Sequence, residues 1–293
     1  MDRARGACVL VICIGLAGWG GGLSAQTGLP LSTPTKLVPG RGVPYFPTPD
    51  EVVAEMLRMA RVGGDDVIYD LGSGDGRIVI SAARIGARGI GVELDPQLVK
   101  DSNENARRAG VADRVQFLQQ DLFELDLSPA TVVTLYLLPG LNEELRPKLL
   151  GLRPGTRIVS HDFDMGDWEP ERVLRVQGWN RKHALYYWVI PANAAGTWRG
   201  RLGGSDSTLT FRQEFQKVSG TVLVNGQNFP LAGVRLVGDR LNFTLMQDSR
   251  PETAMQFAGH IDGDTIKGSV NIRGGPSAGA QDWLVRRDTQ NTP

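Results

Sequence analysis

The sequence predicts an α/β domain with a doubly wound, mostly parallel seven-stranded sheet, followed by a small all-β barrel or sandwich domain. Three observations predict this fold class. Between residues 66 and 191, short apolar runs alternate with helical patterns at the spacing of βαβ units. A glycine-rich turn at 72–76 follows the first of these runs. From residue 196 onward the helical patterns give way to short alternating runs separated by turn dipeptides such as Asn225-Gly226.

The first 25 residues have the layout of a secretory signal peptide. Two arginines precede an apolar run from Ala7 to Leu23, and small residues end it. We expect residues 1–25 to export the chain, as a periplasmic or secreted protein, with an uncleaved membrane anchor as the alternative. Both cysteines, Cys8 and Cys13, lie in this segment, so the exported part would have no disulfide and no thiolate metal site.

Composition limits the classes of partner. The 293 residues carry 32 basic and 32 acidic side chains, so the formal net charge is zero and nothing global attracts a nucleic acid. We therefore expect no nucleic-acid partner. The N-terminal segment leaves membrane or envelope association open, and the sequence does not indicate an oligomeric state.

The predicted elements follow the chain in order. Residues 26–44 are rich in Pro, Gly and Thr and read as a linker. Thr48-Pro49-Asp50-Glu51 is a capping box and predicts a helix that starts at Thr48. Five strands and three helices come next; the expected strands are 66–72, 88–94, 114–120, 131–138 and 156–162, and the expected helices are 76–86, 95–110 and 142–150.

Two further strands, 171–177 and 183–191, follow with no room for a helix between them, which predicts an antiparallel end to the sheet. This α/β domain should occupy residues 45–192. An all-β meander should occupy residues 196–288, with Trp198 and Trp283 closing its core.

The glycine-rich turn carries carboxylates as well as glycines. In "YDLGSGDGRIVI", Asp70 precedes the three glycines and Asp75 lies between the last two. A dinucleotide pyrophosphate would also suit such a turn, but each carboxylate would repel it by about 1 to 4 kcal/mol at contact distance. A ligand with an ammonium and a sulfonium group, S-adenosylmethionine, fits both the glycines and the charges.

Acidic residues at the next strand ends extend this prediction. Glu93 is placed to accept hydrogen bonds from ribose hydroxyls, and Asp121 from an adenine amino group, with Leu122 or Phe123 over the ring. The residues that we predict to bind the cofactor are Asp70, Gly72, Gly74, Asp75, Gly76, Glu93, Asp121, Leu122 and Thr48.

These motifs resemble the seven-strand, Rossmann-like S-adenosylmethionine-dependent methyltransferases. The segments "PYFPTP", "DLGSGDGRIVI" and "PGTRIVSHDFDMGDWEP" are similar to those of the protein-lysine methyltransferases that include the adenine nucleotide translocase and ATP-synthase c-subunit enzymes. The resemblance covers about residues 44–190 and implies a protein lysine as substrate. Two departures are "YLLPGLN", in place of the Asn/Asp-Pro-Pro-aromatic motif of many amino-methylating relatives, and Asp162, where the family has a basic residue.

A lysine must lose its proton before methyl transfer, so its channel has to be desolvated or lined by an acceptor. The channel candidates are Tyr45, Phe46, Thr48, Tyr136, Pro139, His161 and Asp162. Among them Tyr45, Tyr136 and Asp162 are our candidates for a catalytic role. We expect no metal, because neighbouring side chains in His161-Asp162-Phe163-Asp164 face different directions, and we interpret His183 and His260 as ordinary strand residues.

A second hypothesis follows from the export signal. Outside the cytoplasm S-adenosylmethionine is not expected, so the chain would be an exported envelope-associated or binding protein with an inactive methyltransferase fold. The intact set of Asp70, Gly74 and Glu93 argues against it.

Overall fold

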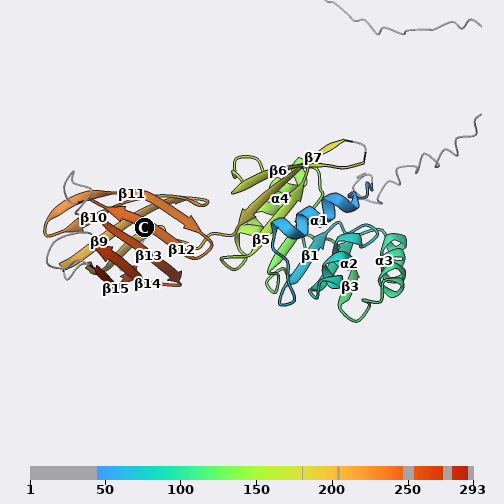
Figure 1. Cartoon of the computed structure of the whole chain (residues 1–293), viewed down its shortest axis with the longest axis horizontal. Helices are drawn as coiled ribbons and strands as arrows, with labels where there is room; N and C mark the ends of the chain where they lie inside the picture. Colours follow the sequence, from blue (N-terminus) through green and yellow to red (C-terminus); the bar gives the residue numbers. More distant parts are fainter. Residues whose placement is uncertain (1–44, 180, 203–204, 247–253, 273–278, 290–293) are drawn as a thin grey trace, which may run out of the picture. The chain divides into compact units, whose positions relative to one another are not determined.

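The computed structural model describes residues 45–179, 181–202, 205–246, 254–272 and 279–289 (Figure 1). The predicted signal peptide or anchor and the predicted linker lie outside these residues. Within the described part of the chain, no helix is long and apolar enough to cross a membrane.

The first domain is built on a seven-stranded sheet with the order β3-β2-β1-β4-β5-β7-β6, which confirms the predicted fold class. The first five strands are parallel, and β7 is antiparallel to both β5 and β6. The strands are β1 (Val67–Leu71), β2 (Arg88–Glu93), β3 (Val115–Gln119), β4 (Val132–Leu135), β5 (Arg157–His161), β6 (Arg172–Gln177) and β7 (Lys182–Val189). The strand order reverses between β1 and β4, where open α/β sheets bind their ligands.

Helices cover both faces of this sheet because its strands are apolar on both sides. They are α1 (Asp50–Met59), α2 (Arg77–Arg84), α3 (Pro96–Arg108) and α4 (Pro139–Leu150). Neighbouring strand residues point to opposite faces: Val132 packs with the core of α1 and α2, whereas Val133 packs with α4.

The start of α1 differs from the prediction. The helix begins at Asp50 with Pro49 as its N-cap, and no side chain caps it. The Thr48 hydroxyl instead bonds with His161, 113 residues away. The predicted capping box at Thr48 is therefore wrong, because a tertiary contact takes the hydroxyl that would have capped the helix.

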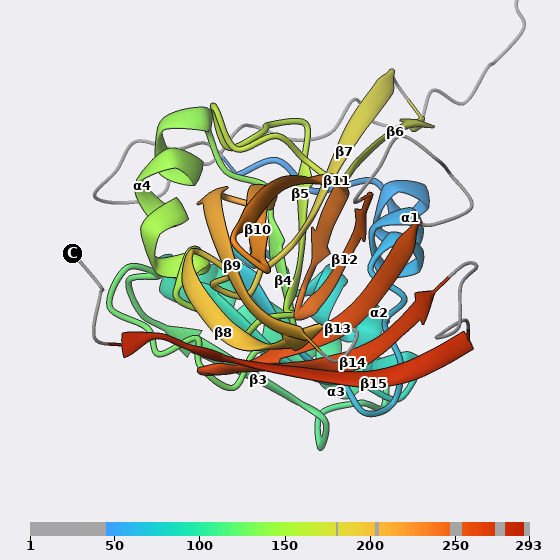
Figure 2. The ribbon, with the colours of Figure 1, turned by 90° about the vertical axis from the view of Figure 1, so that its left-hand side faces the viewer.

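The second domain is a closed antiparallel barrel with the strand order β10-β11-β12-β13-β14-β15-β8-β9 (Figure 2). Its strands are β8 (Gly196–Leu202), β9 (Ser205–Glu214), β10 (Lys217–Val224), β11 (Gln227–Val237), β12 (Arg240–Leu245), β13 (Met255–Asp262), β14 (Thr265–Ile272) and β15 (Gly279–Arg287). The sequence predicted either a barrel or a sandwich for this domain, and the structure shows a barrel.

Aromatic side chains fill the barrel. Trp198 and Trp283 are both buried in its core, as predicted. The rings of Phe243 and Phe257 stack with centroids 4.7 Å apart, and Trp283 meets both rings edge-on. The interior of the barrel is therefore a packed core. The predicted domain limits, 45–192 and 196–288, remain predictions.

Candidate functional site

A cleft opens at the carboxyl ends of β1, β2 and β4, beside residues 45–48, which precede α1. Most of the predicted site residues line it: Tyr45, Thr48, Asp70, Gly72, Asp75, Glu93, Asp121, Leu122 and Tyr136. The predicted residues that do not line this cleft are Gly74, Gly76, Pro139, His161 and Asp162.

The glycine loop needs its glycines for backbone conformation and for space. Gly74 and Gly76 have φ values of 54° and 80°, in the left-handed region that favours glycine. A Cβ atom on Gly74 would lie 2.2 Å from the ring of Tyr45, and one on Gly76 would lie 2.6 Å from the ring of Phe117. The loop can therefore pass closely between these rings only with glycine at both positions.

Glu93, at the end of β2, fixes the glycine loop. Its buried carboxylate accepts hydrogen bonds from the backbone N–H groups of Gly74 at 3.0 Å, Leu94 at 2.7 Å and Asp95 at 3.0 Å. This structural role was not predicted from the sequence. It places the carboxylate in the wall of the cleft, and the predicted bond to ribose would use its remaining lone pairs.

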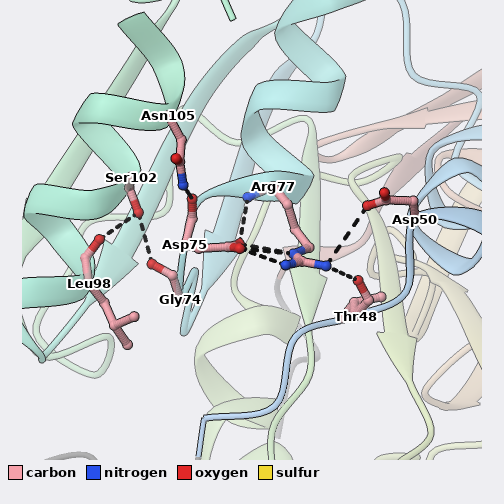
Figure 3. Close-up of polar contacts among 8 residues, drawn as sticks. All are labelled: Thr48, Asp50, Gly74, Asp75, Arg77, Leu98, Ser102 and Asn105. Atoms are coloured by element: carbon pink, nitrogen blue, oxygen red, sulfur yellow. Dashed lines mark hydrogen bonds and ion pairs between the residues drawn. The ribbon is translucent and has the colours of Figure 1, made fainter. Parts of the chain in front are cut away.

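Asp75 does not carry an isolated charge. Its carboxylate forms an ion pair with Arg77 at 2.6 Å, and Arg77 also donates a 2.9 Å hydrogen bond to the carbonyl of Thr48 (Figure 3). Arg77 offsets the negative charge that the sequence analysis assigned to Asp75. It also ties the segment before α1 to the glycine loop, a role that its place directly after the third glycine could have suggested.

Asp70 is the buried acid of the cleft. It is 3% exposed and accepts a 2.7 Å hydrogen bond from the hydroxyl of Thr134 on β4. Burial raises the pKa of Asp70 to about 7; the Thr134 bond opposes this rise, and the charges of Glu93 and Asp75 add to it. A carboxyl group in this state would be stabilised in its charged form by a bound cation.

Two further polar atoms fit the predicted cofactor. The hydroxyl oxygens of Tyr45 and Ser73 are buried and have no hydrogen-bond partner among the described residues. Both residues line the cleft. Buried hydroxyls normally have partners, and S-adenosylmethionine brings a carboxylate, an ammonium and ribose hydroxyls that could serve. Ser73 was not among the predicted site residues.

A buried polar network lies behind one wall of the cleft. Thr48 Oγ1 lies 3.1 Å from His161 Nδ1, and His161 Nε2 lies 2.8 Å from His183 Nδ1. Asp162 Oδ2 is 3.2 Å from both of these inner ring nitrogens. The ring of Tyr136, which lines the cleft, lies 3.9 Å from the ring of His161.

The structure corrects two predictions about this network. Asp162 was expected to line the acceptor channel, but it lies behind the wall and bonds with Arg181 and with the backbone N–H of Ala184. His183 was interpreted as an ordinary strand residue, but it is buried and bonded within the network. His260, in contrast, is half exposed and pairs with Asp239.

Two ionisable groups of this network have shifted pKa values. Burial lowers the pKa of His161 to about 4, against the attraction of Asp162, so the imidazole is neutral at pH 7. Although burial would raise the pKa of Asp162, hydrogen bonds from Arg181 and Ala184 bring it down to about 2. The network thus holds a neutral histidine beside a charged carboxylate.

The spacing of this cluster would also suit a metal ion. The ligand atoms of His161, Asp162 and His183 lie within 4.8 Å of one another. Hydrogen bonds already join these atoms, however, and a guanidinium nitrogen of Arg181 lies 2.5 Å from the same Asp162 oxygen. Because Arg181 already pairs with that oxygen and hydrogen bonds join the other atoms, we interpret the cluster as a hydrogen-bond network.

Comparison with known proteins gives matches to methyltransferases. A family model described as the ANTKMT methyltransferase domain matches residues 70–172. A protein-lysine N-methyltransferase of Saccharolobus islandicus (strain REY15A) is 45% identical over 151 residues, which are 50% of this chain and 94% of that relative. A crystal structure of an RNA methyltransferase from Salinibacter ruber in complex with S-adenosyl-L-homocysteine shares 59% identity, covers 50% of this chain and 95% of that one, and has a TM-score of 0.48.

Two animal enzymes are also similar. The lysine N-methyltransferase of the ATP synthase c-subunit from Xenopus laevis is 34% identical over 133 residues, and the adenine nucleotide translocase lysine N-methyltransferase of Mus musculus is 37% identical over 134. Each match spans 45% of this chain and 58% of the relative, so the chain covers a little over half the length of these enzymes. The archaeal relative is matched over nearly its whole length, and this chain therefore belongs to its family, a family of S-adenosylmethionine-dependent methyltransferases, as the sequence predicted.

Proposed function

We propose that this protein is a protein-lysine N-methyltransferase, which transfers the methyl group of S-adenosylmethionine to the ε-amine of a lysine in a protein substrate. The observation that carries the proposal is the cleft at the ends of β1, β2 and β4, walled by the buried carboxylates of Asp70 and Glu93. The similarity of this chain to the protein-lysine N-methyltransferase of Saccharolobus islandicus supports the choice of acceptor.

Four of the predicted cofactor residues would contact the cofactor directly. Asp70 would pair with the ammonium group, and Glu93 would accept from a ribose hydroxyl while it holds Gly74. Asp121 and Leu122, which also line the cleft, would contact the adenine. The bound cofactor supplies an activated methyl group, so the protein has to orient the amine and keep it neutral.

We assign the acceptor end of the cleft to Tyr45, Thr48 and Tyr136, which all line it. Burial raises the pKa values of both tyrosines, Tyr45 beside Asp75 and Tyr136 beside Asp162, so both phenols stay neutral. Neutral hydroxyls and rings can hold an alkylammonium chain without adding a charge. Desolvation by these walls lowers the pKa of a lysine and favours its reactive, neutral form.

The competing hypothesis, an exported protein with an inactive fold, is not favoured by these similarities. Export by residues 1–25, or their retention as an anchor that brings the chain to a membrane, remains part of our proposal. A reporter fused after Pro293 would test it: activity of a reporter that functions only outside the cytoplasm is expected, and activity only inside would contradict export.

The test of the function uses the full chain, tritiated S-adenosylmethionine and an array of synthetic peptides. Each peptide carries one lysine and has a matched copy with arginine in its place, and a structured RNA transcript serves as a competing acceptor. We expect label only on lysine peptides, and mass spectrometry should place the methyl group on the lysine. Label on the RNA alone would show that the proposed acceptor class is wrong. If calorimetry detects no binding of S-adenosylmethionine at millimolar concentration, the proposal that the protein is a methyltransferase is refuted.

A further inference from the structure

We propose that Thr48, His161 and His183 form a proton wire that removes a proton from the ammonium group of the lysine substrate, with Asp162 pairing with the protonated end. This inference rests on the proposed function and names how that function obtains a neutral amine. Among the described residues that line the cleft there is no histidine, and its carboxylates are assigned to the cofactor or, for Asp75, to Arg77, so we look for the proton acceptor behind its wall.

The wire is continuous from the cleft to the carboxylate. Thr48 lines the cleft, and its hydroxyl reaches His161 Nδ1 at 3.1 Å. The opposite ring nitrogen of His161 reaches His183 Nδ1 at 2.8 Å. These are hydrogen-bond distances, and the imidazole of His161 can accept a proton at Nδ1 while it releases one from Nε2 to His183 Nδ1, where the wire ends.

Burial keeps this path ordered. His161 is fully buried, and His183 is 3% exposed and Thr48 4% exposed. The three residues come from three elements, the segment before α1, the end of β5 and the start of β7, and the antiparallel pairing of β5 with β7 brings the two histidines together. The hydroxyl of Thr48 is free for this purpose because it does not cap α1.

The proton transfer balances without any further reactant. The N–H bond of the substrate breaks and its electron pair stays on nitrogen, while the proton binds Thr48 Oγ1. The hydroxyl proton of Thr48 moves to His161 Nδ1, and the proton on His161 Nε2 moves to His183 Nδ1. His183 becomes an imidazolium 3.2 Å from the Asp162 carboxylate, and the proton returns along the same path to solvent in the cleft after product release.

The surrounding charges support this direction. The titratable and charged groups that face His161 are Tyr136, Asp162, Arg181 and His183. The low pKa of His161 keeps the middle of the wire uncharged, and the low pKa of Asp162 keeps its carboxylate available for an imidazolium. Arg181 pairs with Asp162 from the exposed side, where solvent screens its charge.

The test measures kcat against pH, from 7 to 9.5, with a single-lysine peptide that the wild-type full chain methylates. His183→Asn keeps a hydrogen-bonding side chain but cannot hold the proton, and His260→Asn, in the barrel, is its matched control. Thr48→Val removes the hydroxyl that starts the wire, and Thr48→Ser restores it. Calorimetry with S-adenosylmethionine shows whether each variant keeps the cofactor site.

We expect His183→Asn and Thr48→Val to lower kcat by about 10²-fold at pH 7, the lower range for acid–base catalysis. The loss should shrink to a few-fold toward pH 9.5, because a lysine with a pKa near 10.4 then arrives increasingly neutral from solution. Thr48→Ser should recover most of the kcat that Thr48→Val loses, His260→Asn should stay close to wild type, and His183→Asn should keep its affinity for the cofactor.

A loss in His183→Asn that does not change with pH would overturn the wire, since it would indicate a structural role. An unchanged kcat in His183→Asn, or a fall in its affinity for the cofactor, would overturn the wire as well. Elemental analysis that finds a stoichiometric metal ion in the wild-type chain but not in His183→Asn would also overturn the wire. If the wild-type chain methylates no peptide, the proposed function fails first, which separates that result from a failure of the wire.

Discussion

Asp70 makes the affinity for S-adenosylmethionine depend on pH in a calculable way. Without a ligand its pKa is about 7, and the cationic cofactor should bind the charged carboxylate. The apparent dissociation constant is then multiplied by the factor 1 + 10^(pKa − pH), which is about 11 at pH 6, about 2 at pH 7 and about 1.1 at pH 8. The affinity should therefore rise about tenfold from pH 6 to pH 8.

The perturbation that isolates this effect is Asp70→Asn. The amide keeps the size of the side chain and can accept the Thr134 hydrogen bond, but it does not titrate. Calorimetric titrations of the wild type and of Asp70→Asn at pH 6, 7 and 8 are equally affected by protonation of the cofactor's own amine. The ratio of the two dissociation constants at each pH therefore reports the ionisation of Asp70 alone. Asp101→Asn, on the surface of α3, serves as the control for loss of an acid.

Proton release gives a second measurement in the same experiment. At pH 6 about 0.9 proton should leave Asp70 on binding and at pH 8 about 0.1, which titrations in buffers of different ionisation enthalpy can resolve. Asp70→Asn should release no such proton. If the ratio of affinities is flat across this pH range, or if Asp70→Asn binds as tightly as the wild type at pH 8, the reasoning about Asp70 is refuted.

Three further predictions concern the loop, the ion pair and the barrel. Gly74→Ala should abolish cofactor binding in calorimetry, because its Cβ atom would lie 2.2 Å from the Tyr45 ring. The control Gly140→Ala, which has open space around it, should bind the cofactor normally. Equal cofactor binding by the two variants would contradict the steric argument. Arg77→Met should weaken cofactor binding and increase hydrogen exchange in residues 45–49, since it removes the bond to the Thr48 carbonyl; unchanged exchange would exclude that role. Phe243→Ala should lower the free energy of unfolding of the barrel by about 3 to 5 kcal/mol without changing the cofactor dissociation constant, and a changed constant would show that the barrel contributes to the site.

The sequence could predict the glycine loop and its neighbours because their signals are local. A glycine-rich turn after a buried strand fixes where a ligand binds in a parallel sheet, and Glu93 and Asp121 follow the next strands in order. The charges in the loop were harder to judge. Whether Asp75 faces a ligand or a partner depends on where Arg77 points, and neither composition nor spacing determines a side-chain direction.

His183 shows a different limit. Nothing around it in the sequence distinguishes it from a strand residue that packs in a core. Its role depends on the register of β7 against β5, which places its imidazole 2.8 Å from that of His161, 22 residues earlier. A contact of this kind is a property of the folded sheet, because strand patterns predict pairing but not which polar side chains meet.

Thr48 joins the loop to the network, and it explains why a sound local rule failed there. Its sequence context favours a helix cap, worth about 1 kcal/mol, yet the helix begins without a side-chain cap. Its carbonyl accepts from Arg77 and its hydroxyl bonds with His161, so one residue connects the cofactor loop with the buried histidines. Local preferences are overridden mainly where a residue has tertiary partners, and such positions concentrate at functional sites. The uncapped start of α1 is thus itself an argument that the Thr48 hydroxyl is needed in the cleft.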